Sequence, residues 1–195
     1  MQSGIICLEG IDGAGKETQA QLLKSYLEGM GKVVVPMSFP DYNGPLGSAI
    51  KSALQSHDFN PYALQMLFSA ERLRHLDRIN ECLKNRVFIL ADRYIWSSRV
   101  YAIARGLNRE WSMSLETPLP KPNITILLDI DEETSLKRTG GSDLLEKDTS
   151  LMRRCRNEYI ALANEDSSWI IIDGKLDSST VHNNILYAIE GLLHD

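Results

Sequence analysis

A glycine-rich segment near the N-terminus carries the strongest chemical signal in the sequence. Residues 10–16 read Gly-Ile-Asp-Gly-Ala-Gly-Lys and match the P-loop pattern G-x-x-x-x-G-K. In such a loop, backbone N–H groups converge on phosphate oxygens, the next helix directs its positive dipole end there, and Lys16 adds a mobile charge. The segment is therefore predicted to bind nucleotide phosphates through Gly10, Ile11, Asp12, Gly13, Ala14, Gly15, Lys16, Glu17 and Thr18.

The position after the lysine departs from the P-loop pattern. A Ser or Thr hydroxyl is expected there as a Mg²⁺ ligand, but this chain has Glu17, with Thr18 one residue later. A carboxylate can hold magnesium directly or through water, although beside a triphosphate it also repels. We expect Mg²⁺ to be held by Asp92 and Glu17.

Asp92, Arg93 and Tyr94 form a second cluster, directly after an apolar run. An α/β sheet presents ligand-facing residues at the carboxyl ends of its strands, and an aspartate there can hold Mg²⁺ through water. The competing interpretation of Asp92 and Arg93 is a surface ion pair. Phe68 and Arg72 lie four residues apart, on one helix face, where the alternatives are a core aromatic and a solvated charge.

The elements that must position these residues follow from hydrophobic patterning. Short apolar runs without alternation predict buried parallel strands at 5–8, 33–35, 87–90, 124–128 and 169–172. Helices are predicted at 16–27, from an Asn60 cap and Pro61 to about residue 85, at 151–163 and at 181–193. Strands alternating with helices indicate an α/β three-layer sandwich around a five-stranded parallel sheet, in one domain over residues 1–195.

Composition narrows the class of partner. The 195 residues are 43% hydrophobic and 24% charged, which is ordinary for a globular chain, and 21 Lys and Arg against 26 Asp and Glu give a net charge of −5. This acidic balance argues against coating a nucleic-acid polymer or an anionic membrane. However, the stretch from Lys84 to Arg109 holds six cations and Asp92 as its one acid, which favours a local positive pocket.

Cysteine usage and apolar run lengths indicate the compartment. Cys7, Cys82 and Cys155 are far apart and lack metal-ligand spacing, which is typical of reduced thiols. No apolar run reaches the roughly 18 residues of a membrane span, and the N-terminus lacks signal-peptide features. A cytoplasmic location is therefore expected.

Taken together, the motifs resemble the thymidylate kinase family of P-loop nucleoside monophosphate kinases. The resemblance covers nearly the whole chain. It comprises the P-loop, Phe39-Pro40-Asp41-Tyr42, residues 67–72, Asp92-Arg93-Tyr94 with Ser97, Ser98 and Tyr101, residues 119–123 and residues 128–131. It implies transfer of the ATP γ-phosphoryl group to dTMP, giving dTDP and ADP for dTTP synthesis, and it implies a homodimer.

The resemblance also implies roles for individual residues. Phe68 would stack on thymine, Arg72 would bond its exocyclic oxygen, Asp12 would hold the 3′-hydroxyl and Tyr101 would crowd the 2′ position. Arg93 would bridge the acceptor phosphate and the γ-phosphate. The implied catalytic set is Lys16, Asp92, Arg93 and Arg138, and the implied acceptor set is Asp12, Phe39, Pro40, Tyr42, Phe68, Arg72, Arg93, Ser97, Ser98 and Tyr101.

The sequence departs from the family pattern at the arginine that neutralises phosphate charge. Family members without an arginine in the P-loop, as here with Gly13, usually supply one from a lid. We expect the lid at about 138–150, where Leu144-Leu145 replaces the usual arginine, so that Arg138 or Lys147 would compensate.

Two alternatives remain open at the sequence level. A kinase of another deoxynucleotide or of a deoxynucleoside is the first, and for a nucleoside Glu9 is the candidate base. A nucleotide-binding homologue without turnover is the second, motivated by Glu17 and the arginine-poor lid.

Overall fold

Five strands form the centre of the molecule, as the apolar runs predict. The computed structural model describes residues 3–56, 60–140 and 148–193. Its strands pair only in parallel, in the order β2-β3-β1-β4-β5. Their bounds are β1 (Gly4–Glu9), β2 (Val34–Ser38), β3 (Phe88–Asp92), β4 (Ile124–Asp129) and β5 (Trp169–Asp173). All six residues of β1 are buried, because this central strand is covered on both faces.

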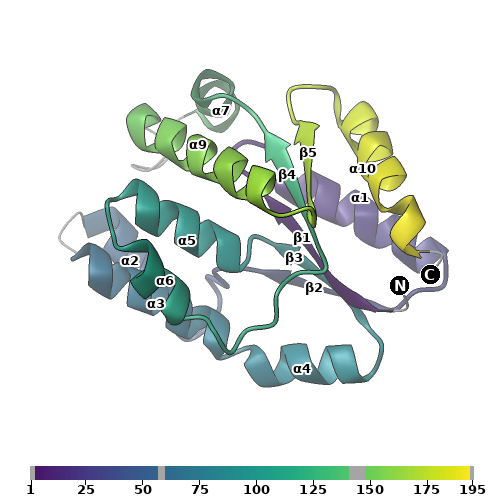
Figure 1. Ribbon diagram of the computed structural model, residues 1–195, viewed down its shortest axis with the longest axis horizontal. Helices are drawn as coiled ribbons and strands as arrows, with labels where there is room; N and C mark the ends of the chain where they lie inside the picture. The colour runs from purple at the N-terminus through teal and green to yellow at the C-terminus, as the bar shows by residue number, and fades with distance from the viewer. Residues whose placement is uncertain (1–2, 57–59, 141–147, 194–195) are drawn as a thin grey trace.

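Two helix layers cover the sheet, and their sides follow from the strand order (Figure 1). The connection from β1 to β2 runs toward one edge, whereas those from β2, β3 and β4 run the opposite way. Right-handed crossovers therefore place α1 (Lys16–Gly29) on one face and α4 (Leu76–Lys84), α5 (Ile95–Ala104) and α9 (Thr149–Glu165) on the other. The last helix, α10 (Ser178–Leu193), returns to pack against α1 and β5. This confirms the predicted three-layer α/β sandwich.

The predicted helix from Asn60 to about residue 85 is wrong in one respect, because it is two helices. Asn60 does cap α3 (Pro61–Leu73), accepting a bond from the backbone N–H of Tyr62 at 2.9 Å. The chain then turns at Arg74 and His75, where the His75 N–H bonds to the Arg72 carbonyl at 3.0 Å, before α4 begins. Arg74 pairs with Asp41, and the His75 ring meets Phe39 edge-on. Tertiary contacts thus break a segment that has no Gly or Pro to signal a break.

Among the described residues, three helices besides α5 lie outside the sequence predictions. They are α2 (Gly47–Ser56), α6 (Arg109–Ser114) and α7 (Glu132–Thr139). Both α2 and α5 pack against α3. The short α6 is capped by Asn108 and α7 by Asp131, whose side chains accept backbone N–H bonds.

The strand order also identifies the edge of the sheet at which α/β folds usually bind their ligands. The connections of the neighbouring strands β1 and β3 leave toward opposite edges, so the carboxyl ends of these strands form the topological switch point of the sheet. Leu8 pairs with Asp92 there, and the N–H of Arg93 continues the ladder to the Leu8 carbonyl at 2.9 Å. The P-loop and the Asp92-Arg93 cluster therefore emerge side by side.

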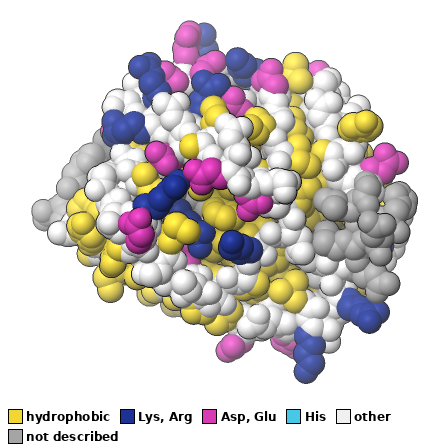
Figure 2. All heavy atoms as spheres, in the orientation of Figure 1, with side chains coloured by type: hydrophobic (Ala, Val, Ile, Leu, Met, Phe, Trp, Pro, Cys, Tyr) yellow, Lys and Arg dark blue, Asp and Glu magenta, His cyan; other side chains and the backbone are white. Residues whose placement is uncertain are grey.

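Charged side chains of both signs gather over α7 and α9 on the face shown in Figure 2. Arg153 pairs with Glu132 there, and Lys137 pairs with Glu133. This mixture differs from the continuous basic stripe that typically binds nucleic acid. Within the part of the chain that the structure describes, no helix is long and apolar enough to cross a membrane.

Candidate active site

The P-loop backbone bends where only glycine fits. Gly10 has φ +142°, and a Cβ there would lie 2.6 Å from the Leu128 carbonyl oxygen. Gly15, at φ +93°, takes the left-handed conformation immediately before α1. The side chains of Ile11 and Ala14 are buried, so these two predicted ligands contribute backbone groups to the loop.

Lys16 lies inside this loop with its ammonium group held by backbone oxygens. Its Nζ donates to the carbonyls of Gly10 and Ile11, both at 3.0 Å, and only 7% of the residue is exposed. Burial, together with the charge of Arg93, lowers the pKa of Lys16 to about 8. The lysine is therefore poised to gain an anionic partner.

Arg93 joins the two chain segments of the switch point. It has φ +62°, an uncommon conformation for a residue with a side chain, directly after β3. Its Nη1 donates to the Gly10 carbonyl and to Ser97 Oγ, both at 3.0 Å, and its Nη2 pairs with Asp12. Burial alone would raise the pKa of Asp12, but the charges of Arg93 and Lys16 hold it below its usual value.

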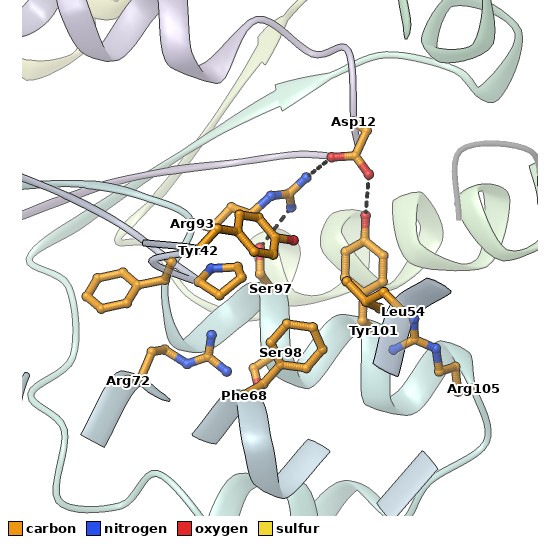
Figure 3. Close-up of a pocket in the computed structure, with 12 residues that line it drawn as sticks. Asp12, Tyr42, Leu54, Phe68, Arg72, Arg93, Ser97, Ser98, Tyr101 and Arg105 are labelled. Atoms are coloured by element: carbon orange, nitrogen blue, oxygen red, sulfur yellow. Dashed lines mark hydrogen bonds and ion pairs between the residues drawn. The ribbon is translucent and has the colours of Figure 1, made fainter. Parts of the chain in front are cut away.

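A cavity of about 260 Å³ opens beside Arg93 (Figure 3). Its lining contains every residue predicted for the acceptor, namely Asp12, Phe39, Pro40, Tyr42, Phe68, Arg72, Arg93, Ser97, Ser98 and Tyr101. These side chains come from the P-loop, the segments after β2 and β3, α3 and α5. Packing alone brings together residues that lie up to 89 positions apart, such as Asp12 and Tyr101, whose hydroxyl donates to Asp12 at 3.4 Å.

The sequence analysis offered a core aromatic as the alternative for Phe68 and a solvated charge as the alternative for Arg72, and the structure agrees with neither alternative. Phe68 is half-buried with its ring at the cavity (Figure 3), so it is not a simple core residue. Arg72 is only 1% exposed and pairs with Glu116, so it is not a solvated charge.

Ser97 belongs to a buried network around Glu9. The two Glu9 oxygens accept bonds from Ser97 Oγ at 2.6 Å, Tyr159 Oη at 2.9 Å, and the backbone N–H groups of Tyr94 and Ser97 at 2.9 and 3.1 Å. This fully buried carboxylate stabilises the start of α5, because both of its oxygens already accept hydrogen bonds from donors there. The environment of Glu9 therefore does not favour its role as the base of a nucleoside kinase.

A second cavity, of about 650 Å³, lies over the P-loop and adjoins the first. Five residues line both cavities: Asp12, Phe39, Pro40, Tyr42 and Arg93. The remaining lining residues of the second are Gly13, Gly15, Lys16, Glu17, Thr18, Ser38, Asp92 and Arg138. All four predicted catalytic residues and six of the nine predicted phosphate-binding residues therefore line this cavity, whereas Gly10, Ile11 and Ala14 line neither of the two.

Asp92 and Glu17 fit a magnesium ion that is shared with a nucleotide. One carboxylate oxygen of Asp92 is buried without a hydrogen-bond partner among the described residues, so it has a free ligand position beside Lys16. No group of three or more His, Cys, Asp or Glu side chains in the described ranges could hold a metal ion. Mg²⁺ usually takes one or two carboxylates together with substrate phosphates and water, and Asp92 and Glu17, which line the same cavity, offer two carboxylates.

Arg138 reaches the P-loop from the end of α7. Its Nη1 donates to the carbonyls of Gly13 and Gly174, at 3.2 and 2.8 Å. A Cβ on Gly13 would lie 3.1 Å from the Ser135 carbonyl oxygen, so α7 packs closely against this position of the loop. Lys147 and most of the expected lid, residues 141–147, lie outside the described residues.

Three lining residues escaped the sequence interpretation. Leu54 and Arg105 line the first cavity and Ser38 lines the second. Leu54 lies on α2, a helix that the sequence did not predict. Arg105 follows Tyr101 by four residues, and this helical spacing is the signal that could have found it.

The fold, with a P-loop at the switch point of a parallel sheet and two adjoining cavities beside it, is that of a P-loop phosphotransferase. A family model described as thymidylate kinase matches residues 8–185. The chain is 36% identical over 201 residues to the probable thymidylate kinase of Thermococcus kodakarensis, covering 96% of this chain and 98% of that protein. It is 34% identical over 185 residues to that of Methanosphaera stadtmanae, covering 92% and 94%. The chain belongs to the thymidylate kinase family.

A solved structure agrees with this membership. Thymidylate kinase from Candida albicans superposes with a TM-score of 0.83 at 28% identity, covering 99% of this chain and 94% of that chain.

Proposed function

We propose that this member of the thymidylate kinase family transfers the γ-phosphoryl group of ATP to dTMP, with dTMP in the cavity between α3 and α5 and the ATP phosphates in the P-loop. The observation that carries the proposal is the junction of the two cavities at Arg93 and Asp12. A phosphoryl group can pass between two nucleotides only where their phosphates meet in line, and a buried guanidinium suits that position.

The acceptor cavity suits a pyrimidine deoxynucleotide. Phe68 offers an aromatic face on which a base can stack, and Arg72 offers N–H donors to an exocyclic oxygen. Asp12 and Tyr101 are hydrogen-bonded to each other. In the proposed complex Asp12 binds the sugar 3′-hydroxyl, and the Tyr101 ring disfavours a 2′-hydroxyl.

The chemistry requires alignment and charge neutralisation. An oxygen of the dTMP phosphate forms a bond to the γ-phosphorus while the bond from that phosphorus to the bridging oxygen of ADP breaks. Lys16 and Arg93 donate to the transferring group as its charge spreads, and Arg138 supplies a further positive charge from α7. Mg²⁺ held by Asp92 and Glu17 would neutralise the donor phosphates.

The acceptor range tests the activity. ADP release is followed in a coupled assay with ATP, Mg²⁺ and, in turn, dTMP, dUMP, UMP, CMP and thymidine. We expect dTMP to be the best acceptor and thymidine to be inert. Phosphorylation of thymidine but not of dTMP would overturn the assignment.

The same assay separates a kinase from a non-catalytic homologue. Lys16→Ala should lower turnover by orders of magnitude, because it removes charge stabilisation of the transition state. If the unmodified protein bound ATP and dTMP by calorimetry but released no ADP, it would be a nucleotide-binding homologue instead.

Further predictions complete the proposal. We propose that residues 1–195 form one domain, with a lid at about 138–150, and that two copies form a homodimer. The cytoplasmic location expected from the cysteines stays a prediction.

A further inference from the structure

A buried ion pair joins Arg72, which lines the acceptor cavity, to Glu116, which lies outside every motif that the sequence analysis used. Arg72 on α3 and Glu116, which follows α6, are 1% and 0% exposed. The Nε and Nη2 atoms of Arg72 lie 2.9 and 2.8 Å from the same Glu116 oxygen, Oε1. Ser69, one helical turn before Arg72, donates its hydroxyl to that oxygen at 3.0 Å. Glu116 therefore contacts two nitrogen atoms on one side of the Arg72 guanidinium.

A second buried arginine near Glu116 makes this carboxylate important for the orientation of the Arg72 side chain. A second arginine, Arg99, is buried nearby with its guanidinium 4.9 Å from the centre of the Trp96 ring. Burial lowers the pKa of Arg99, while the charge of Glu116 raises it and the charge of Arg72 lowers it further. Glu116 therefore attracts two cations that repel each other, and it holds Arg72 against that repulsion.

Arg72 itself lines the acceptor cavity, beside Phe68 (Figure 3). A guanidinium carries only donors, so whatever it meets in the cavity must accept a hydrogen bond. A pyrimidine with a carbonyl at C4 satisfies this demand, whereas a 4-amino group presents its own N–H donors. The direction in which Arg72 points therefore discriminates between these two classes of base.

We propose that Glu116 is a positioning residue that orients Arg72 and so determines the preference for 4-oxo over 4-amino pyrimidine nucleotides. This inference rests on the proposed function, in which Arg72 bonds the exocyclic oxygen of thymine. Glu116 does not touch the substrate; it acts through Arg72.

A purely structural ion pair would behave differently. Breaking a buried pair leaves an uncompensated charge and destabilises the fold. That loss lowers the active fraction for every acceptor alike and leaves the ratio between two acceptors unchanged. The ratio of kcat/KM values for two acceptors is therefore the decisive quantity, since it reports on the folded molecules alone.

The test compares dTMP with 5-methyl-dCMP, two acceptors that differ only in the C4 group and the proton at N3. The ratio of their kcat/KM values is measured for the unmodified protein and for Glu116→Gln, which keeps an accepting oxygen but loses the charge. We expect the preference for dTMP to fall severalfold, because the remaining hydrogen bond from Arg72 to a neutral amide oxygen is about half as strong as one to a carboxylate. Ser69→Ala, which leaves the ion pair intact, should lower the preference by a smaller factor.

Glu71→Gln is the matched control. Glu71 is equally buried on α3, but its Oε1 accepts from the Asp41 backbone N–H and lies 3.2 Å from the His75 ring instead of contacting Arg72. Its dTMP to 5-methyl-dCMP ratio should equal that of the unmodified protein.

The outcomes separate this inference from the proposed function. Unmodified protein that fails to phosphorylate dTMP would overturn the function itself. Active protein whose ratio is unchanged in Ser69→Ala and in Glu116→Gln would overturn the positioning role of Glu116 and leave the kinase assignment intact. If Glu116→Gln proves too unstable to purify, Ser69→Ala decides alone: a fallen ratio supports the role, and an unchanged ratio overturns it.

Discussion

At the scale of single residues, the charge state of Lys16 is coupled to ligand binding. Its ammonium is buried against the Gly10 and Ile11 carbonyls, and its pKa of about 8 lies below the usual 10.5. Bound phosphates would favour the charged form and raise this pKa. We therefore expect ATP binding near pH 8 to take up a proton, and ATP affinity to fall as the pH rises above 8.

Calorimetry of ATP binding at pH 8, in buffers with different ionisation enthalpies, measures that proton uptake. Lys16→Met should abolish it. Equal proton uptake in Lys16→Met and in the unmodified protein would assign the titration to another group.

The same pKa has a consequence for stability without ligand. Because the folded protein releases the Lys16 proton more readily than the unfolded chain, the unfolded chain holds more protons between about pH 8 and 10.5. The contribution of Lys16 to the free energy of unfolding therefore increases with pH across that window.

At the scale of elements, the packing of α7 against the P-loop decides what residue 13 can be. Gly13 has φ +75°, and a Cβ there would lie 3.1 Å from the Ser135 carbonyl oxygen and 3.1 Å from Thr139 Cγ2. Ser135 also donates its hydroxyl to the Asp12 carbonyl at 2.7 Å. α7 therefore supports the P-loop at residue 13, where little space is left for a side chain.

Gly13→Ala should push α7 away from the loop. We expect a loss of at least about 1 kcal/mol in the free energy of unfolding, measured by denaturant titration, because strained backbone and close contact add. ATP affinity should fall severalfold in calorimetry, while dTMP affinity should change less.

Gly31→Ala is the matched control for this element. Gly31 has nearly the same φ, +76°, but no heavy atom lies within 4 Å of its added Cβ. Gly31→Ala should lower the free energy of unfolding through backbone strain, but it should leave the ATP affinity unchanged. An equal loss of ATP affinity in both variants would remove α7 packing as the cause.

At the scale of the whole molecule, the acidic total conceals a positive acceptor cavity. Arg72, Arg93 and Arg105 line that cavity, and the lining also contains the acid Asp12, which pairs with Arg93. Outside the cavity, cations can be neutralised by neighbouring carboxylates. Arg109, for example, lies within 4 Å of Glu158 and Glu165. A small anionic substrate needs only this local field, so a net charge of −5 and phosphate binding are compatible.

The homodimer is also a property at this scale, and it rests on family resemblance. Sedimentation equilibrium should give twice the mass of one chain at micromolar concentration. A single-chain mass that persists as the protein concentration is raised would contradict the dimer.

The spacing of residues along the sequence was enough to predict the strands, the P-loop and many residues of the candidate site. The strands could be predicted because buried apolar runs are short and contiguous, and the P-loop because its backbone angles demand glycine at fixed positions. The ordered motifs, through their family resemblance, indicated the acceptor residues that line the cavity. Each of these signals lies within a few neighbouring residues.

Only the tertiary structure decided which distant residues meet. Arg72 and Glu116 lie 44 residues apart, and nothing near Glu116 signals that it pairs with a residue lining the cavity. The break between α3 and α4 and the contact of Arg138 with the P-loop likewise depend on partners supplied by other elements. Sequence spacing specifies the faces of helices and strands, but the pairing of buried charges depends on how those faces pack, because a charge is buried only where a partner is brought to it.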